Sequence, residues 1–538
     1  MGDLLLDVNI AVDICSRREP FCQSAAEAVA RCMGQGRKVW LYAGSVQTLQ
    51  YVLATELART VTHEGQPLAV AEAQGRACRL LDHFAADKGW LAALAGEGPV
   101  FEADDPEDEQ LLRALGRFPD GEIALLTKSP HAMHPEQYLS CSSSAPAVPF
   151  VDLATQQDIV RPRLEQNLHR VLHHGQYIMG PEVAELEAKL ADYVGVTHAI
   201  GCSSGTDGLL MALMALGVGP GDAVFTTPFT FVATAEVISL LGATPVFVDI
   251  DPATFNLDPA QLESAVQALA AGDPGLHPLP ANHRDLTARC VIAVDLYGLP
   301  ADYDPIQETC TRHGLFLVED AAQSFGAEYR GRRACSFGDV GVTSFFPAKP
   351  LGCYGDGGMA FTTRDDLAEA MRSIRVHGKG SDKYDNVRVG LNARLDTLQA
   401  AIVLAKFDAF PDEVASRQAV ATAYDHALAG CTATGLVCPS LSPDCRSAWA
   451  QYTVRLPADL RGALQQRLGK QGIPSVVYYP RSLHLQTAFA ELGYAGGAFP
   501  QSEQAAGEVL SLPFGPYFGG VDQVAAALAS AVTRVTGV

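Results

Sequence analysis

The chain is poor in basic residues: 39 Lys and Arg stand against 61 Asp and Glu among 538 residues, a formal net charge of −22. Such an acidic chain argues against a large nucleic-acid-binding surface and against binding to anionic membranes. It still allows an anionic small-molecule substrate, because a binding site needs only a few local cations. No apolar run reaches the roughly 18 residues that a membrane-spanning helix requires.

Targeting and metal-binding patterns are also missing. Residues 1–7 lack the basic start and the long apolar segment of a signal peptide. The 13 cysteines are odd in number and scattered, and no Cys/His cluster has the spacing of a zinc site. We therefore expect reduced thiols, a cytoplasmic location and no metal.

A stretch rich in Ser, Ala and Pro, residues 140–147, has the composition of a linker and divides the chain. The part before it, residues 1–139, opens with a short apolar strand at 4–7 and has another at 123–127. Helical patterns lie between these two strands. This pattern predicts a small α/β domain.

The part after the linker alternates apolar strands with amphipathic helices, which predicts a mostly parallel sheet with helices on both faces. We expect residues 148–395 to form this large domain. Residues 396–538 are mainly helical with a few short strands, which predicts a smaller C-terminal α+β subdomain. The expected strands of the sheet are 223–226, 245–249, 291–295, 315–318 and 340–345.

A lysine and a carboxylate follow two of these strands. Lys349 lies in a loop flanked by Pro and Gly, and Asp320 ends the strand that starts at 315. A pyridoxal phosphate site needs this pair: the lysine forms a Schiff base, and the acid keeps the pyridine nitrogen protonated so that the ring accepts electrons. The alternatives are that Lys349 is an ordinary surface lysine and that Asp320 caps a helix. The presence of the other residue of the pair weakens each alternative.

Other residues fit the same cofactor. Gly205 and Thr206 begin a helix whose free N–H groups and dipole suit a phosphate, although such residues also simply cap helices. Ser344 can add a hydroxyl to that phosphate. Phe231, after another strand, is expected to stack on the ring, with a core phenylalanine as the alternative. Gln323 is expected to donate to the ring oxygen.

Asn392 and Arg394 lie in a short motif at the start of a predicted helix. An asparagine can donate to a phosphate, and an arginine can hold a carboxylate or a diphosphate with two hydrogen bonds. The alternative is an exposed helix start, and the spacing of the two residues does not decide between these interpretations.

With these residues assembled, the chain from about residue 148 to its end resembles the DegT/DnrJ/EryC1/StrS sugar aminotransferase family. The members of this family are fold-type I pyridoxal phosphate enzymes. The stretches that carry the resemblance are 150–153, 174–183, 204–207, 319–326, the Lys349 loop and 390–396.

The resemblance implies a transamination in which the lysine carries the cofactor and moves protons between the donor amino acid and the sugar. It also implies a homodimer with shared active sites, in which the Asn392 loop reaches the phosphate and substrate of the neighbouring subunit. A branch of the family has histidine at the lysine position and performs a dehydration. Because Lys349 is present, we predict transamination.

Within the family, residues 174–180, 343–358 and 394–402 are closest to a branch that acts on UDP-2-acetamido-2-deoxy-3-oxo-glucuronate with glutamate as the amino donor. The products of that branch serve bacterial surface polysaccharides. Tyr478 stands where the family often has histidine, and residues 271–289 form an atypical insertion, so another nucleotide sugar, such as a 4-oxo sugar, is the alternative. The predicted substrate contacts are His377, Arg394, Tyr479 and His484.

The first part resembles a PIN-type nuclease domain through residues 5–9, 18–21, 105–108 and 125–129. Such nucleases hold Mg²⁺ or Mn²⁺ with three or four carboxylates. Asp7 and Asp108 are present as vestigial metal ligands, but residues 45–50 lack the expected middle acid. We therefore predict a degenerate PIN-like domain that is used for assembly or regulation.

Two other functions were weighed against transamination. The first is a metal-dependent PIN-type ribonuclease with an appended sensor domain, which the two retained acids favour and the missing acid disfavours. The second is a non-catalytic module that binds pyridoxal phosphate or a nucleotide sugar. A pure binder has no need of Lys349, Asp320 and Gln323 together.

Overall fold

The computed structural model describes residues 148–382, 384–430 and 435–536, together with five short strands of the preceding chain. By its internal contacts the chain divides into two compact units, Met1–Ala145 and Pro146–Val538. The division falls inside the predicted linker, residues 140–147.

The described strands of the first unit form a three-stranded parallel sheet and a two-stranded antiparallel pair. The predicted strands at 4–7 and 123–127 are both present and lie next to each other, with Leu5 opposite Leu125. Asp7 and Asp108 lie outside the described residues, so the PIN-type resemblance stays a prediction. The strands are β1 Gly2–Leu6, β2 Val39–Leu41, β3 Thr62–His63, β4 Gln66–Pro67 and β5 Glu122–Leu126.

The second unit is built on a seven-stranded sheet in the order β6-β14-β13-β10-β9-β7-β8. All its strands run parallel except β14, which is antiparallel to both of its neighbours. The predicted α/β class with a mostly parallel sheet is thus confirmed. The strands are β6 His198–Cys202, β7 Asp222–Thr226, β8 Thr244–Phe247, β9 Thr287–Val294, β10 Phe316–Asp320, β13 Val340–Ser344 and β14 Gly358–Thr362.

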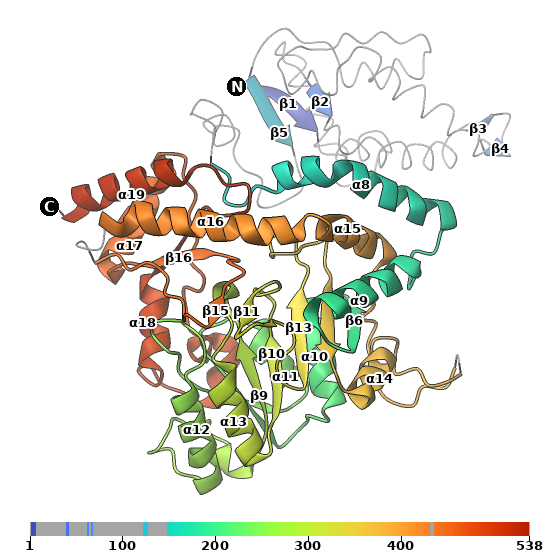
Figure 1. The fold of residues 1–538 in the computed structure, drawn as a ribbon, viewed down its shortest axis with the longest axis vertical. Coiled ribbons are helices and arrows are strands. Elements are labelled where there is room, and N and C mark those ends of the chain that lie inside the picture. The colour runs from blue at the N-terminus through green and yellow to red at the C-terminus, as the bar shows by residue number, and fades with distance from the viewer. Residues whose placement is uncertain are drawn as a thin grey trace. The chain divides into compact units, whose positions relative to one another are not determined.

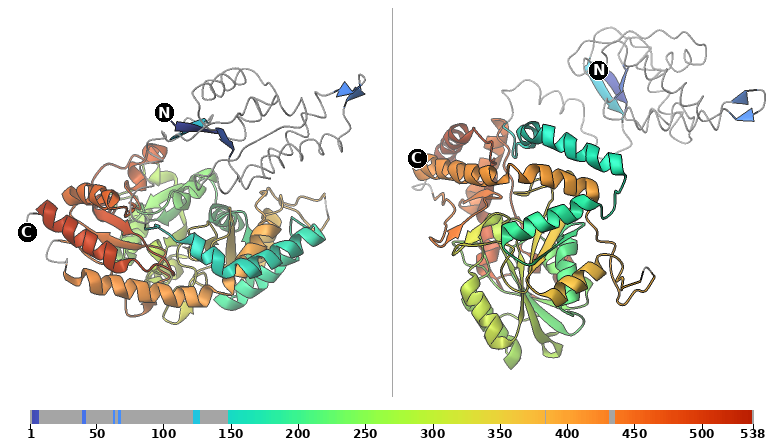
Figure 2. Two further views of the ribbon diagram at one scale, coloured as in Figure 1. Left: turned by 90° about the horizontal axis from the view of Figure 1, so that it is seen from above. Right: turned by 45° about the vertical axis from the view of Figure 1, so that its right-hand side comes forward.

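Helices cover both faces of this sheet (Figures 1 and 2). Successive residues of a strand point to opposite faces, and β10 shows the result. Val318 packs with one set of helices, which includes α10 and α14, and Leu317 packs with another, which includes α12 and α13. The helices that cover the two faces are α9 Pro181–Val194, α10 Gly205–Ala215, α11 Ala233–Leu240, α12 Pro259–Ala271, α13 Tyr303–His313 and α14 Asp365–Ile374.

The end of the chain adds a small helical layer with short antiparallel strands. An aromatic core that includes Tyr424, Trp449 and Tyr452 holds this layer together. The helix α16 links it to the large sheet, because its Phe410 packs with the large domain and its Leu428 with the small one. The remaining elements are α8 Leu153–His174, α15 Thr397–Phe407, α16 Phe410–Leu428, α17 Ala458–Lys470, α18 Pro500–Glu508, α19 Val521–Thr536, β11 Glu328–Tyr329, β12 Arg332–Arg333, β15 Cys445–Arg446, β16 Tyr452–Arg455 and β17 Val509–Leu512.

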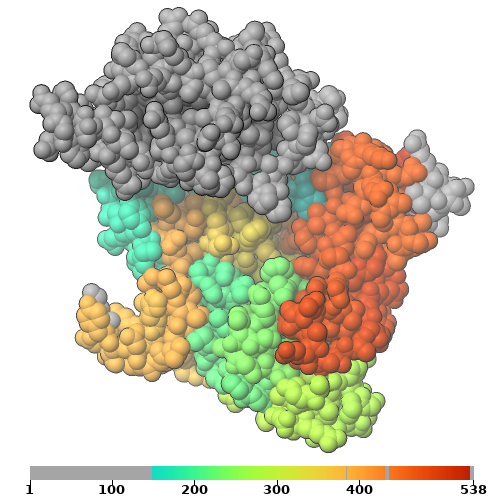
Figure 3. All heavy atoms as spheres, turned by 180° about the vertical axis from the view of Figure 1, so that it is seen from behind, coloured from blue at the N-terminus to red at the C-terminus, as the bar shows by residue number. Residues whose placement is uncertain are grey.

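Two further segments of this unit differ in how they pack. The stretch after α14 projects from the body of the unit (Figure 3). The segment 271–289, predicted to be an atypical insertion, packs against the protein: Asn282 donates to the Thr244 hydroxyl (2.9 Å), and the Ala281 N–H donates to the carbonyl of Leu492 (2.9 Å). No helix in the described parts of the chain is long and apolar enough to cross a membrane.

Candidate active site

The loops at the carboxyl edge of the large sheet bring the predicted cofactor residues together. Asp320 is the last residue of β10, Lys349 lies in the loop after β13, and Phe231 lies in the loop after β7. Ligands of open α/β sheets bind at this edge, because the side chains that follow parallel strands converge there.

The carboxylate of Asp320 is fixed by two hydrogen bonds in a buried position. Its Oδ2 accepts the hydroxyl of Thr234 at 2.7 Å, and its Oδ1 accepts the backbone N–H of Ala322 at 3.2 Å. Thr234 lies in the first turn of α11, and its hydroxyl also meets that of Thr230 at 3.2 Å. Burial raises the pKa of Asp320, while the Thr234 bond and the charge of Lys349 oppose that rise.

Lys349 has the electrostatic character of a nucleophilic amine. Burial lowers the pKa of Lys349 from 10.5 to about 8, and the charge of Asp320 partly offsets that change. A buried ammonium group is costly, so the lysine gives up its proton more readily than one in water. The neutral amine is the form that attacks a carbonyl carbon, and the lowered pKa increases its share near physiological pH.

Gln323 connects this region to the small domain. Its amide oxygen accepts the backbone N–H of Tyr297 at 2.8 Å, and its amide nitrogen donates to the hydroxyl of Tyr479 at 3.3 Å. The ring of Phe231 lies 6.2 Å from that of Tyr479, centroid to centroid. Phe231 is 52% exposed, so its face is open to stack on a planar ligand.

The start of α10 forms a close-packed cradle beside β13. Ser204 caps the helix by accepting the N–H of Asp207 at 3.0 Å, and the N–H groups of the first turn have no partner within the helix. A side chain at Gly205 would place its Cβ 2.9 Å from that of Ser344, and one at Gly358 would lie 2.6 Å from the Ser204 carbonyl carbon. These glycines allow the start of α10 to pack closely against β13 and β14, and the N–H groups at the start of α10 that Ser204 does not cap suit a phosphate.

The Asn392 segment lies along the strand that precedes this cradle. The N–H of Ser203 donates to the carbonyl of Ala393 at 3.1 Å, and the guanidinium of Arg394 donates to the side-chain oxygen of Asn392. Asn392 is exposed, as is His377, whose backbone N–H bonds to Leu391 at 2.8 Å. The fold therefore gathers three of the predicted contact residues on neighbouring segments.

His484, another of the predicted substrate contacts, lies inside the protein. It is 2% exposed, its Nε2 meets Glu503 at 3.0 Å, and its ring lies 4.9 Å from that of Phe499. Burial lowers its pKa. Its role in substrate binding stays a prediction, and its surroundings indicate a part in holding the loop that it lies on.

Two further residues of this region have no identifying pattern in the sequence. Thr234 and Tyr297 both bond to predicted cofactor residues, yet neither lies in a motif that identifies it. A threonine four residues after Thr230, where a helix starts, was the only local signal for the first. The second had none, because its partners are distant in sequence.

The residues present fit pyridoxal phosphate. The cradle at Gly205 and Thr206 offers the N–H groups of a helix start to a phosphate. Asp320 presents a buried carboxylate, and Lys349 presents an amine whose pKa is about 8. An anion seat, an acid and a nucleophilic amine along one sheet edge can together support amino-group transfer.

Comparison with known proteins also indicates amino-group transfer. The model of the DegT/DnrJ/EryC1/StrS aminotransferase family matches residues 159–529. A relative from Pseudomonas aeruginosa, named UDP-2-acetamido-2-deoxy-3-oxo-D-glucuronate aminotransferase, is 47% identical over 370 residues, which cover 69% of this chain and 96% of that protein. The second unit thus has a counterpart of nearly full length.

Solved structures agree. A DegT DnrJ EryC1 StrS aminotransferase from Brucella abortus has a TM-score of 0.67 and 45% identity, covering 72% of this chain and 100% of its own. The protein ntda from Bacillus subtilis, solved with bound cofactor pmp, has a TM-score of 0.64 and 28% identity, covering 73% of this chain and 86% of its own. The chain belongs to the DegT/DnrJ/EryC1/StrS aminotransferase family.

Proposed function

We propose that this protein transfers the amino group of glutamate to the 3-oxo carbon of a UDP-linked sugar, with UDP-2-acetamido-2-deoxy-3-oxo-glucuronate as the expected substrate. Aminotransferases of its family depend on pyridoxal phosphate. The observation that carries the proposal is the pairing of Lys349 with the buried Asp320 in a chain 47% identical to an enzyme named for that sugar.

The cofactor, when bound, would supply an electron sink for the electrons released at the donor carbon and at the sugar carbon. Lys349 Nζ would take the proton from the Cα of glutamate and later deliver a proton to C3 of the sugar. Asp320 would hold a proton on the ring nitrogen through its carboxylate. Gly205, Thr206 and Ser344 would bind the phosphate, and Phe231 would cover the ring.

The substrate side of the proposal rests on the predicted contact residues. Arg394 offers a guanidinium to a carboxylate or a diphosphate, and Tyr479 offers a hydroxyl close to Gln323. His377 and Asn392 are exposed on segments beside Arg394, and in the proposed homodimer the Asn392 segment would serve the site of the neighbouring subunit. These groups suit an anionic nucleotide sugar despite the strongly negative net charge of the chain.

A homodimer is part of the same proposal. Val387 and Val389, on the projecting stretch after α14, are 56% and 86% exposed, and Ile178 is 50% exposed. Ile178 pairs with Asp396, so it adjoins the Asn392 segment. Large apolar side chains on a projecting stretch are typical of surfaces that another protein covers. A second copy is the occupant that the family resemblance implies.

The absorbance spectrum of the purified protein tests the proposal. A visible cofactor band that shifts when glutamate is added, and that Lys349→Ala abolishes, would support the cofactor, the lysine and the donor together. Lys406→Met is the matched control, because the pKa of Lys406 is also lowered to about 8 by burial. Absence of the band after incubation with pyridoxal phosphate would overturn the proposal.

The sugar substrate is tested separately, after glutamate has given up its amino group to the cofactor. Return of the band with a UDP-3-oxo sugar would support the proposed substrate. Return only with a 4-oxo nucleotide sugar would replace that substrate and leave the reaction class intact. The place of the product in polysaccharide synthesis stays a prediction.

A further inference from the structure

Tyr297 lies in a short 3-10 turn, Leu296–Gly298, between the large sheet and the small domain, and it uses every polar group it has. Its N–H donates to the amide oxygen of Gln323 at 2.8 Å, and its carbonyl accepts the N–H of Ala450 at 2.9 Å. Its hydroxyl donates to the backbone carbonyl of Tyr478. One residue therefore contacts three distant segments.

These contacts close into a ring of hydrogen bonds. Gln323 donates back to the hydroxyl of Tyr479, the residue that follows Tyr478. The ring runs from Gln323 to Tyr297, to the 478–479 segment, and back to Gln323. The orientation of the Gln323 amide and the position of Tyr479 are thus set together.

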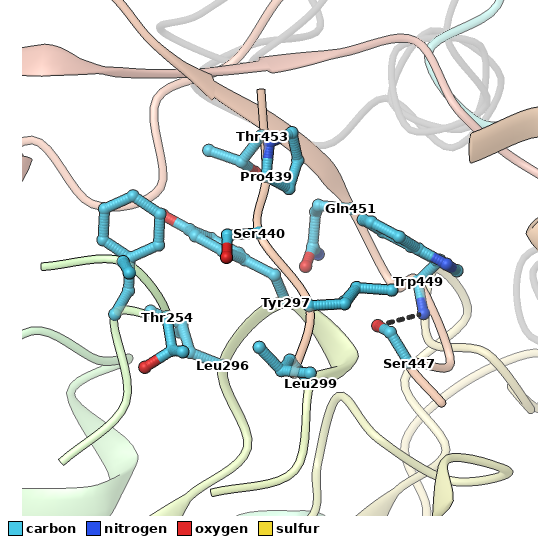
Figure 4. Close-up of a pocket in the computed structure, with 13 residues that line it drawn as sticks. Thr254, Leu296, Tyr297, Leu299, Pro439, Ser440, Ser447, Trp449, Gln451 and Thr453 are labelled. Carbon is cyan, nitrogen blue, oxygen red and sulfur yellow. Dashed lines mark hydrogen bonds between the residues drawn. The ribbon is translucent and has the colours of Figure 1, made fainter. Parts of the chain in front are cut away.

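The surroundings of Tyr297 make the hydroxyl contact important. Tyr297 is 7% exposed, and its ring packs edge-on against Phe255 at 5.7 Å. Figure 4 shows it among the side chains that line a cavity, with Gln451 and Trp449 nearby. In this mostly buried position the hydroxyl makes a directed contact with the Tyr478 carbonyl, which packing of the aromatic ring alone would not supply.

We propose that Tyr297 is a positioning residue for the sugar-binding side of the site, holding Tyr479 in place through Tyr478. The inference rests on the proposed function. The Tyr297 hydroxyl bonds to neither Lys349 nor Asp320, and Gln323 is oriented by the backbone N–H of Tyr297, so losing the hydroxyl leaves the groups of the glutamate reaction in place. Binding of the nucleotide sugar, which Tyr479 is expected to contact, does depend on that hydroxyl.

The variant Tyr297→Phe tests this inference, because it keeps the ring against Phe255 and removes the hydroxyl alone. The part-buried carbonyl of Tyr478 then loses this partner, and the loss of such a bond weakens a linked interaction by about tenfold. We expect KM for the sugar to rise by about that factor, with kcat and the rate of the glutamate reaction nearly unchanged. Calorimetry with UDP-N-acetylglucosamine on the cofactor-free protein should show a Kd that is raised by a similar factor.

The matched control is Tyr424→Phe. Tyr424 is also buried in the small domain, and its hydroxyl donates to the carbonyl of Pro513 at 2.7 Å. This control removes the same kind of bond away from the hydrogen-bonded ring, so we expect KM and Kd close to those of the unmodified protein.

Two results would overturn the inference: Tyr297→Phe behaving like Tyr424→Phe in sugar binding, or Tyr297→Phe slowing the glutamate and sugar reactions equally. Failure of the proposed function has a different signature, since the unmodified protein itself would then show no spectral response to glutamate. The outcomes for the two proposals are thereby kept apart.

Discussion

Thr234 donates its hydroxyl to the Oδ2 of Asp320 across 2.7 Å, and neither side chain is more than 5% exposed. The two residues come from different elements, the first turn of α11 and the end of β10. The bond leaves the carboxylate one orientation in a dry environment. An acid that must face a ring nitrogen benefits from being held in this way before the ligand arrives.

Replacing Thr234 with valine should therefore impair both halves of the proposed reaction. Thr234→Val keeps the shape and removes the hydroxyl, which leaves Asp320 with a missing partner. We expect kcat to fall about tenfold or more, by analogy with the loss of a buried hydrogen bond to a charged group. Rapid-mixing absorbance with glutamate measures the effect. Thr362→Val is the control, since Thr362 is buried and donates to the Asp339 carbonyl at 2.7 Å; equal effects of the two variants would contradict the prediction.

The stability of the cofactor-free protein should depend on pH through Lys349. Its pKa is about 8 in the folded protein and 10.5 as the ordinary value, so the unfolded chain binds more protons between these two pH values. Stability from this residue therefore rises as pH increases from about 8 to 10.5. Lys349→Met removes the unfavourable burial of charge, so it should raise Tm most below pH 8 and progressively less toward pH 10.5.

Thermal unfolding scans across that pH range check the prediction. Lys379→Met, which replaces an exposed lysine, should give a difference in Tm that does not vary with pH. A pH-independent difference for Lys349→Met would show that the charge of this lysine is not penalised in the fold.

The ion pair between Arg375 and Glu187 should be important for stability. Arg375 is 5% exposed, and its Nη1 lies 2.5 Å from Glu187 Oε1 and 3.0 Å from the Gly201 carbonyl. Arg375→Met leaves the Glu187 carboxylate, 16% exposed, with the Gly201 N–H at 2.8 Å but without its ion-pair partner, which costs about 3 kcal/mol. Urea unfolding measures the loss. Arg312→Met breaks surface ion pairs instead and should cost no more than about 1 kcal/mol.

The proposed homodimer predicts that a charge on the projecting stretch will separate the subunits. Val389→Asp places a carboxylate on a side chain that is 86% exposed, where a second copy would have to bury it. Sedimentation velocity should show a shift from dimer to monomer, with loss of activity because the Asn392 segment no longer reaches a neighbour. Leu240→Asp, at a position 68% exposed on α11, should leave the assembly unchanged. A dimer that tolerates Val389→Asp would exclude this stretch from the interface.

Local patterns were enough for most of the sheet and for the motif residues. The apolar runs that predicted strands at 223–226, 245–249, 291–295, 315–318 and 340–345 correspond to β7, β8, β9, β10 and β13. The helix predicted after Gly205 ends next to Gly217, whose φ is 72°. The antiparallel β14 was not predicted, because the glycine-rich run before it resembles a loop.

Burial was harder to anticipate than element type. His484 is a predicted substrate contact, and the fold encloses its ring among Phe247, Tyr494 and Phe499. Those aromatic residues come from β8 and from the segment before α18. A histidine gives no sequence signal that separates an enclosed position from an exposed one.

The sequence by itself determined the alternation of strands and helices and the presence of Lys349, Asp320 and the cradle at Gly205, because these depend on periodicity and on residues close together in the chain. Only the tertiary structure decided which side chains hold them. Thr234 and Asp320 are 86 residues apart, and Tyr297 and Tyr478 are 181 apart. Such pairs form where packing brings strand ends and the small domain together, and a hydrogen bond acts only over that final distance.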